Sequence, residues 1–101
     1  MIIYNVTINV DDSVHDEFMK FMKEVHVNDV VNTGCFSSGT IFKILVEEQA
    51  GTSYAFQYRA PNMEAVNRYV ENFAPKLRQE VTDKFGDKFT AFRTLLEEVK
   101  S

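Results

Sequence analysis

The chain has 101 residues, of which 45% are hydrophobic and 26% are charged, enough apolar material for one domain with one core. Its 11 Lys and Arg residues against 15 Asp and Glu residues give a net charge of −4, which argues against a general electrostatic grip on nucleic acid or anionic membrane. A single cysteine excludes an intrachain disulfide, and we find neither a signal peptide nor a segment of membrane-helix length. We therefore expect a cytoplasmic protein, one domain over residues 1–101, with no membrane or nucleic-acid partner.

The first third of the chain predicts a strand followed by a helix. Apolar and polar residues alternate over residues 2–10, so this strand has one apolar face and one mixed face, which carries Asn5. Asp11-Asp12-Ser13 supplies candidate N-caps, and apolar residues then recur at helical spacing, which predicts a helix over residues 14–26. Residues 27–34 are interpreted as a connection.

Two strands joined by a turn at Gln49-Ala50-Gly51 are predicted next, over residues 36–48 and 52–60. The second of them has the aromatic residues Tyr54, Phe56 and Tyr58 on one face. We expect the following residues to share the face of Asn5: Ile41, Lys43 and Leu45 from the first strand, and Ser53, Ala55, Gln57 and Arg59 from the second.

A second helical stripe follows Pro61-Asn62 and reaches Gly86, a candidate C-cap. Pro75 lies inside it and predicts a kink or break, because proline lacks the amide hydrogen and its ring clashes with the preceding turn. Residues 88–99 are predicted to form the last strand. Arg93 interrupts its apolar face, so the side that Arg93 takes depends on whether a bulge changes the register.

The resulting βαββαβ order predicts an α+β, ferredoxin-like fold: a four-stranded antiparallel sheet with both helices on one face. The face without helices would be half apolar and half polar. Such a face is poorly suited to water, and pairing two copies across a two-fold axis would cover it. The sequence therefore predicts a homodimer.

Asn5, Lys43, Gln57 and Arg59 are the candidate ligand-binding residues on that face. Cations that face a partly apolar interior need an anion, a water or another acceptor, and the first three strands place no acid beside them. A small anionic molecule held in the barrel would satisfy them. In the alternative interpretation, Lys43 and Arg59 extend along their alkyl stems to solvent at the rim.

Other functional patterns are weaker. The order βαββαβ with Tyr54 and Phe56 on the third strand is also that of an RNA-recognition motif. If those rings stacked on bases, however, Asn5, Thr7 and Asn9 would have to face the helices, and three polar residues in a core are costly. No convergent acid, base and nucleophile are visible, so we assign no catalytic residue and leave open whether the chain is an enzyme. We also expect no metal and no cofactor, since neither histidine has a ligand spacing.

The segments YNVTINVDDSVHDEF, SYAFQYRA and FRTLLEE resemble the dimeric α/β-barrel superfamily and, more closely, a bacterial family of single-domain proteins of unknown function. The resemblance spans nearly the whole chain. It implies ferredoxin-like domains that pair sheet to sheet, in a superfamily that includes antibiotic-biosynthesis-type monooxygenases. It also implies Asn5 and Tyr4 as strand residues that could occupy a site.

Two classes of function follow. The first is an uncharacterised homodimeric barrel that binds a small, anionic molecule or acts as a scaffold. The second is a cofactor-independent enzyme of the monooxygenase or isomerase type. An RNA-binding module is a remote third.

Overall fold

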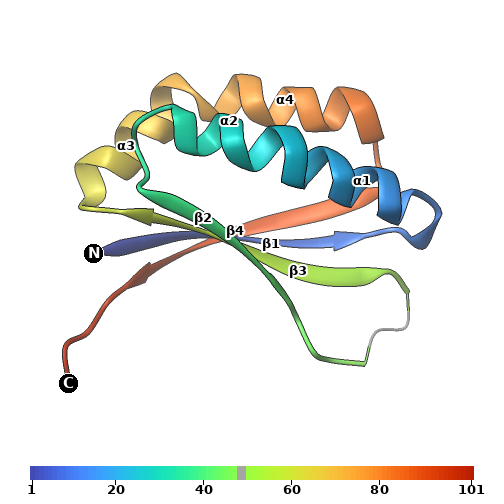
Figure 1. Cartoon of the computed structure of the whole chain (residues 1–101), viewed down its shortest axis with the longest axis horizontal. Helices are drawn as coiled ribbons and strands as arrows, with labels where there is room; N and C mark the ends of the chain where they lie inside the picture. Colours follow the sequence, from blue (N-terminus) through green and yellow to red (C-terminus); the bar gives the residue numbers. More distant parts are fainter. Residues whose placement is uncertain (48–49) are drawn as a thin grey trace.

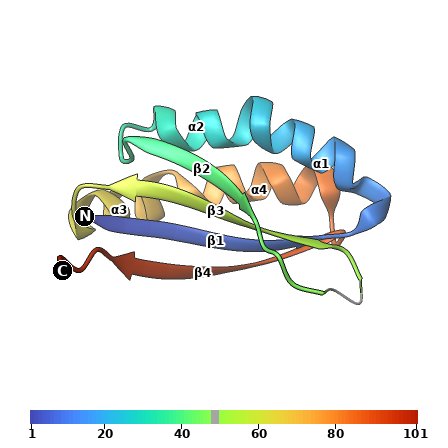
Figure 2. The same ribbon diagram turned by 60° about the horizontal axis from the view of Figure 1, so that its bottom comes forward.

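The computed structural model describes residues 1–47 and 50–101. Four strands form one antiparallel sheet in the order β2-β3-β1-β4, and the helices cover only one of its faces (Figures 1 and 2). This arrangement confirms the predicted ferredoxin-like fold. None of the helices in the described part of the chain is long and apolar enough to cross a membrane. In chain order the elements are β1 (Ile2–Val10), the 3-10 turn η1 (Asp12–Val14), α1 (His15–Phe21), the π-helical η2 (Met22–His26), α2 (Val27–Asn32), β2 (Ser38–Lys43), β3 (Thr52–Ala60), α3 (Met63–Asn72), α4 (Ala74–Phe85) and β4 (Phe89–Glu97).

The central strand β1 defines the two faces of the sheet. Its even-numbered residues are buried against the helices, and Val6 pairs with Phe56 on β3 and with Arg93 on β4. The β1–β4 register runs without interruption from Phe89 to Glu97, so no bulge intervenes. Arg93 therefore lies on the helix-covered side, which settles the register that the sequence left open.

The first helical layer is longer than predicted. It begins where the Asp11 carboxylate accepts hydrogen bonds from the Ser13 hydroxyl at 2.7 Å and the Ser13 amide at 2.9 Å, and these two bonds lower the pKa of Asp11. It does not end at His26 but continues through η2 and α2 to Asn32. The helix ends where Gly34 takes a φ of +84°, the left-handed conformation that glycine adopts at a helix C-terminus.

Strand β2 is shorter than predicted and presents the opposite face. It ends at Lys43, and Lys43 pairs with Tyr54 on the helix-covered side, so the prediction that Lys43 shares the face of Asn5 is wrong. Ile41 likewise packs against the core, and Leu45 lies beyond the strand with 89% of its surface exposed. The predicted turn at residues 49–51 begins outside the described residues; Gly51 itself has a φ of +74°.

Gly39 explains why Ile41 and Lys43 lie on the helix-covered face of the sheet. A Cβ atom at Gly39 would lie 2.9 Å from Val27 Cγ1 and 3.0 Å from the Tyr58 ring, so Gly39 faces the helices where α2 crosses the sheet closely. Since side chains alternate along a strand, a glycine on this face turns Thr40 and Phe42 to the open face.

The second helical layer is divided, as predicted. Helix α3 ends at Asn72, α4 begins at Ala74, and Pro75 lies in the first turn of α4, where a missing amide hydrogen removes no helical hydrogen bond. Both halves bury apolar residues against the sheet, among them Tyr69 and Val81.

Candidate functional site

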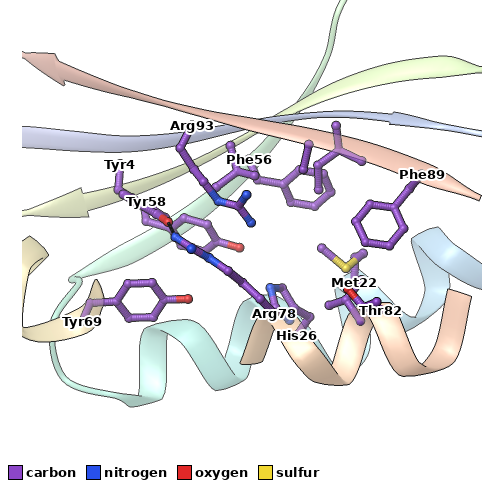
Figure 3. Close-up of a pocket in the computed structure, with 14 residues that line it drawn as sticks. Tyr4, Met22, His26, Phe56, Tyr58, Tyr69, Arg78, Thr82, Phe89 and Arg93 are labelled. Carbon is purple, nitrogen blue, oxygen red and sulfur yellow. Dashed lines mark hydrogen bonds between the residues drawn. The ribbon is translucent and has the colours of Figure 1, made fainter. Parts of the chain in front are cut away.

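A partly open cavity of about 290 Å³ lies between the helix-covered face of the sheet and the helices (Figure 3). Apolar and aromatic side chains form most of its wall, and no acidic residue lines it within residues 1–47 and 50–101. Its polar lining consists of three tyrosines, two arginines, one histidine and one threonine: Tyr4, Tyr58, Tyr69, Arg78, Arg93, His26 and Thr82.

The two arginines enter the cavity from opposite layers. Arg93 extends from β4 and Arg78 from α4, and both side chains reach into the space between sheet and helices (Figure 3). Arg78 donates a hydrogen bond from Nη2 to the Tyr4 hydroxyl at 2.7 Å. Within residues 1–47 and 50–101 neither guanidinium forms an ion pair; the ion pair found there joins His15 and Asp16. The cavity therefore carries two positive charges without a negative partner in the described chain.

The tyrosines supply neutral hydroxyl groups to the same space. Burial raises the pKa of Tyr58 and of Tyr69, and the neighbouring tyrosines raise both further, so both phenols stay protonated. The rings of Tyr4 and Tyr69 meet edge to face with centroids 5.5 Å apart. Because packed aromatic rings have few alternative rotamers, their hydroxyl groups are held in fixed positions.

His26 is the third polar element of the cavity. Burial, opposed by Asp29 and assisted by Arg93, lowers the pKa of His26 from 6.5 to about 4, so the imidazole is neutral at pH 7. Its Nδ1 atom is buried and has no hydrogen-bond partner among the described residues. The ring belongs to the π-helical segment η2, and π-helical turns are frequent at functional sites because they redirect side chains within a helix.

The opposite, open face of the sheet carries three of the four predicted ligand residues. Asn5 pairs with Gln57, and Arg59 lies two residues further along β3 on the same face. Asn5 is buried and donates from Nδ2 to the Thr7 hydroxyl at 3.1 Å, whereas its Oδ1 is buried without a partner in the described part of the chain. A ligand-binding role for these three residues stays a prediction.

Lys43, the fourth predicted residue, is far from that group in the sheet. It lines a shallow surface hollow together with His15, Asp16 and Tyr54. There the His15 ring forms two hydrogen bonds, one between Nε2 and the Tyr54 hydroxyl at 2.7 Å and one between Nδ1 and the Asp16 carboxylate at 2.8 Å. The structure therefore does not bring Lys43 together with Asn5, Gln57 and Arg59.

Comparison with known families gives one match. Residues 1–99 match the family described as Domain of unknown function (DUF4286). The chain belongs to this family. No curated protein sequence is significantly similar to it.

Solved structures share the fold at low sequence identity. A crystal structure of an antibiotic biosynthesis monooxygenase aligns with a TM-score of 0.66 at 13% identity, covering 99% of this chain and 100% of that one. SnoaB, a cofactor-independent oxygenase from Streptomyces nogalater, aligns in a variant form with a TM-score of 0.68 at 13% identity, covering 99% and 95%. A de novo designed protein with a ferredoxin fold aligns with a TM-score of 0.55 at 18% identity, covering 99% and 88%. At these identities the likeness establishes the fold and not the chemistry.

Most of the cavity's polar residues were not predicted as functional. His26 was interpreted as lying at a helix end, because the helix was expected to stop there. Gly34 was the signal that could have corrected this, since glycine is common just after a helix C-terminus. For Arg78 and Tyr69 the sequence offers only their positions on a helix, and their meeting with Tyr4 depends on tertiary packing.

Proposed function

We propose that this protein binds a small anionic molecule in the cavity between the sheet and the helices. The observation that carries this proposal is the pair Arg78 and Arg93, which reach one aromatic cavity without an acidic residue among the described residues that line it. Arg78 is half-buried and donates to the Tyr4 hydroxyl, and Arg93 is exposed to solvent, so both guanidinium groups keep N–H donors that an anion in the cavity can accept. A bound carboxylate would supply that anion, and guanidinium groups bind carboxylates through paired, charge-assisted hydrogen bonds.

The size and lining of the cavity support a ligand with a single ring. An apolar cavity of roughly 150 Å³ holds benzene, and this cavity measures about 290 Å³. Aromatic walls, such as Phe56 and Phe89, favour a flat apolar body, while the arginines hold its charged group.

Calorimetric titration of benzoate into the protein tests this proposal. The wild type should bind, and Arg93→Gln should weaken binding by about tenfold or more, the size of one lost charge-assisted hydrogen bond. Arg59→Gln, on the open face, is the matched control and should leave the affinity unchanged. Loss only in Arg59→Gln would place the anion on the open face instead. Equal loss in both variants would show that the anion has no preference for the cavity, and either this result or no binding of benzoate and related aromatic acids would refute the proposal.

An enzymatic role is the second candidate, and His26 favours it. A neutral imidazole whose Nδ1 has no partner among the described residues can accept a proton from an acidic C–H bond of a bound ligand, and the two guanidinium groups can stabilise the resulting enolate. Such a site fits an isomerase or a cofactor-independent oxygenase, the activity named for the similarly folded Streptomyces protein. Exchange of the α-protons of phenylpyruvate in D₂O, followed by NMR, should be faster with the wild type than with His26→Leu. Equal rates would exclude proton abstraction by His26 from this substrate.

We further propose that residues 1–101 form one domain, that the protein is a cytoplasmic homodimer, and that two copies meet through the open face of the sheet. Phe42, Phe92 and Leu96 are exposed there by 50%, 63% and 42%, and the buried Oδ1 of Asn5 lies among them without a described partner. A second sheet would cover these side chains. The lone cysteine supports a reducing compartment.

Light scattering of the purified protein tests the dimer. The wild type should have about twice the monomer mass at micromolar concentration. Phe92→Asp should give a folded monomer, because a carboxylate buried between two sheets has no partner. Val70→Asp, on the outer surface of α3, is the control and should stay dimeric. A monomeric wild type would contradict the proposal.

A further inference from the structure

We propose that the ligand of the cavity is a hydroxylated aromatic acid and that His26 is the residue that recognises its hydroxyl group. This inference rests on the proposed function, in which Arg78 and Arg93 hold the acidic group. It adds the chemical class of the ligand and a residue that determines specificity.

The starting observation is the Nδ1 atom of His26. It is buried, it has no hydrogen-bond partner in the described part of the chain, and its ring lines the cavity. A buried polar atom without a partner destabilises the folded protein, and native structures rarely leave one in place without a reason. The imidazole lines the cavity and also packs against the Phe21 ring, with centroids 6.4 Å apart. Since Nδ1 itself is enclosed, a ligand in the cavity reaches it when the imidazole turns toward that space.

The chemistry of the ring indicates a hydroxyl group as that partner. The imidazole is neutral at pH 7, since burial holds its pKa at about 4. A hydroxyl group both donates and accepts hydrogen bonds, so it can pair with Nδ1 in either tautomer of a neutral ring. A second carboxylate would be a poorer partner, because a neutral ring gives it at most one N–H and the ion would lie among apolar residues.

The polar groups lie on opposite walls of the cavity, so they would bind opposite ends of the ligand. Arg93 descends from the sheet, whereas His26 rises from the helical layer opposite, with Phe56 beside the space between them (Figure 3). A ring bound between these layers would direct one substituent to the guanidinium and another to the imidazole. Met22, also from η2, would contact the face or edge of that ring.

Calorimetric titration of benzoate, 3-hydroxybenzoate and 4-hydroxybenzoate at pH 7 tests the inference. In the wild type at least one hydroxybenzoate should bind about tenfold more tightly than benzoate, the gain from one hydrogen bond to a desolvated partner. In His26→Leu this preference should disappear, while benzoate affinity stays the same or rises. His26→Gln, which keeps a hydrogen-bonding group, should retain part of the preference, and it replaces His26→Leu if that variant does not fold.

The outcomes distinguish anion binding in the cavity from hydroxyl recognition by His26. If benzoate binds through the arginines but neither hydroxybenzoate binds more tightly, the proposed function stands and the role of His26 is refuted. The same holds if His26→Leu keeps the full preference. If none of the three acids binds to the wild type, the proposed function itself fails.

Discussion

Lowering the pH from 7 to 4 should destabilise the native protein through His26. The buried imidazole has a pKa of about 4, against 6.5 for an exposed one, because burial disfavours the charged ring. Between these two values the unfolded chain binds a proton that the native state does not. The contribution of the neutral His26 to the free energy of unfolding is therefore fully present above pH 6.5, decreases as the pH falls through this window, and is lost completely only below pH 4.

The magnitude follows from the size of that window. The shift from 6.5 to about 4 corresponds to a loss of about 2 kcal/mol at pH 5 and about 3 kcal/mol at pH 4, at 1.36 kcal/mol for each pH unit. Such a loss is a large fraction of the free energy of unfolding of a small domain, which is roughly 5–15 kcal/mol.

Urea unfolding followed by circular dichroism at pH 7, 6, 5 and 4 measures this effect. The comparison is between the wild type and His26→Gln, which has the same acidic residues and the same His15 but no titrating group at position 26. The wild type should lose about 3 kcal/mol more than the variant between pH 7 and pH 4. Parallel curves for the two proteins would refute the reasoning, since they would mean that His26 titrates alike in both states.

Three further substitutions test one hydrogen bond, one glycine conformation and the helix break. Tyr4→Phe removes the acceptor 2.7 Å from Arg78 and should lower the free energy of unfolding by about 1–2 kcal/mol in urea denaturation; no change would mean that the hydrogen bond contributes nothing. Gly51→Ala should cost at least about 1 kcal/mol, because Gly51 has a φ of +74° and its Cβ would lie 2.6 Å from the Val10 carbonyl oxygen; an unchanged melting temperature would contradict this. Pro75→Ala should alter stability by less than about 1 kcal/mol, since Pro75 occupies the first turn of α4, and a larger loss in thermal unfolding would show that the helix break depends on it.

Much of the fold follows from local sequence patterns. Strand β3 has the predicted limits, Thr52–Ala60, and β1 the predicted Ile2–Val10, because both alternate strictly and are bounded by turn or cap residues. The break before Pro75 was also predictable, since proline restricts the backbone wherever it occurs.

Strand β2 was not predictable in the same way. The segment places apolar residues on both faces of the predicted strand: Ile41 and Leu45 on one face, and Phe42 and Ile44 on the other. Alternation alone therefore cannot identify which face is buried. The choice is made by Gly39, which lets α2 approach the sheet. The contact between Gly39 on β2 and Val27 on α2 forms only in the folded chain, so it cannot be read from local sequence.

The candidate site depends even more on tertiary structure. His26, Arg78 and Arg93 come from three elements, and no spacing within the sequence connects them. The sequence did indicate cations in need of an anion, but on the open face of the sheet, where Lys43 was misplaced. The cations that line a cavity are instead Arg78 and Arg93, on the helix-covered face.

The central claim is that the anion binds on the helix-covered side of the sheet, and methyl-resolved NMR tests it most directly. During titration with 4-hydroxybenzoate, the account predicts chemical-shift changes at Ile8, Met22 and Val81, whose side chains line the cavity. Ile3 and Leu96, paired with each other on the open face, should not respond. Shifts confined to Ile3 and Leu96, or no shifts at saturating ligand, would contradict the account.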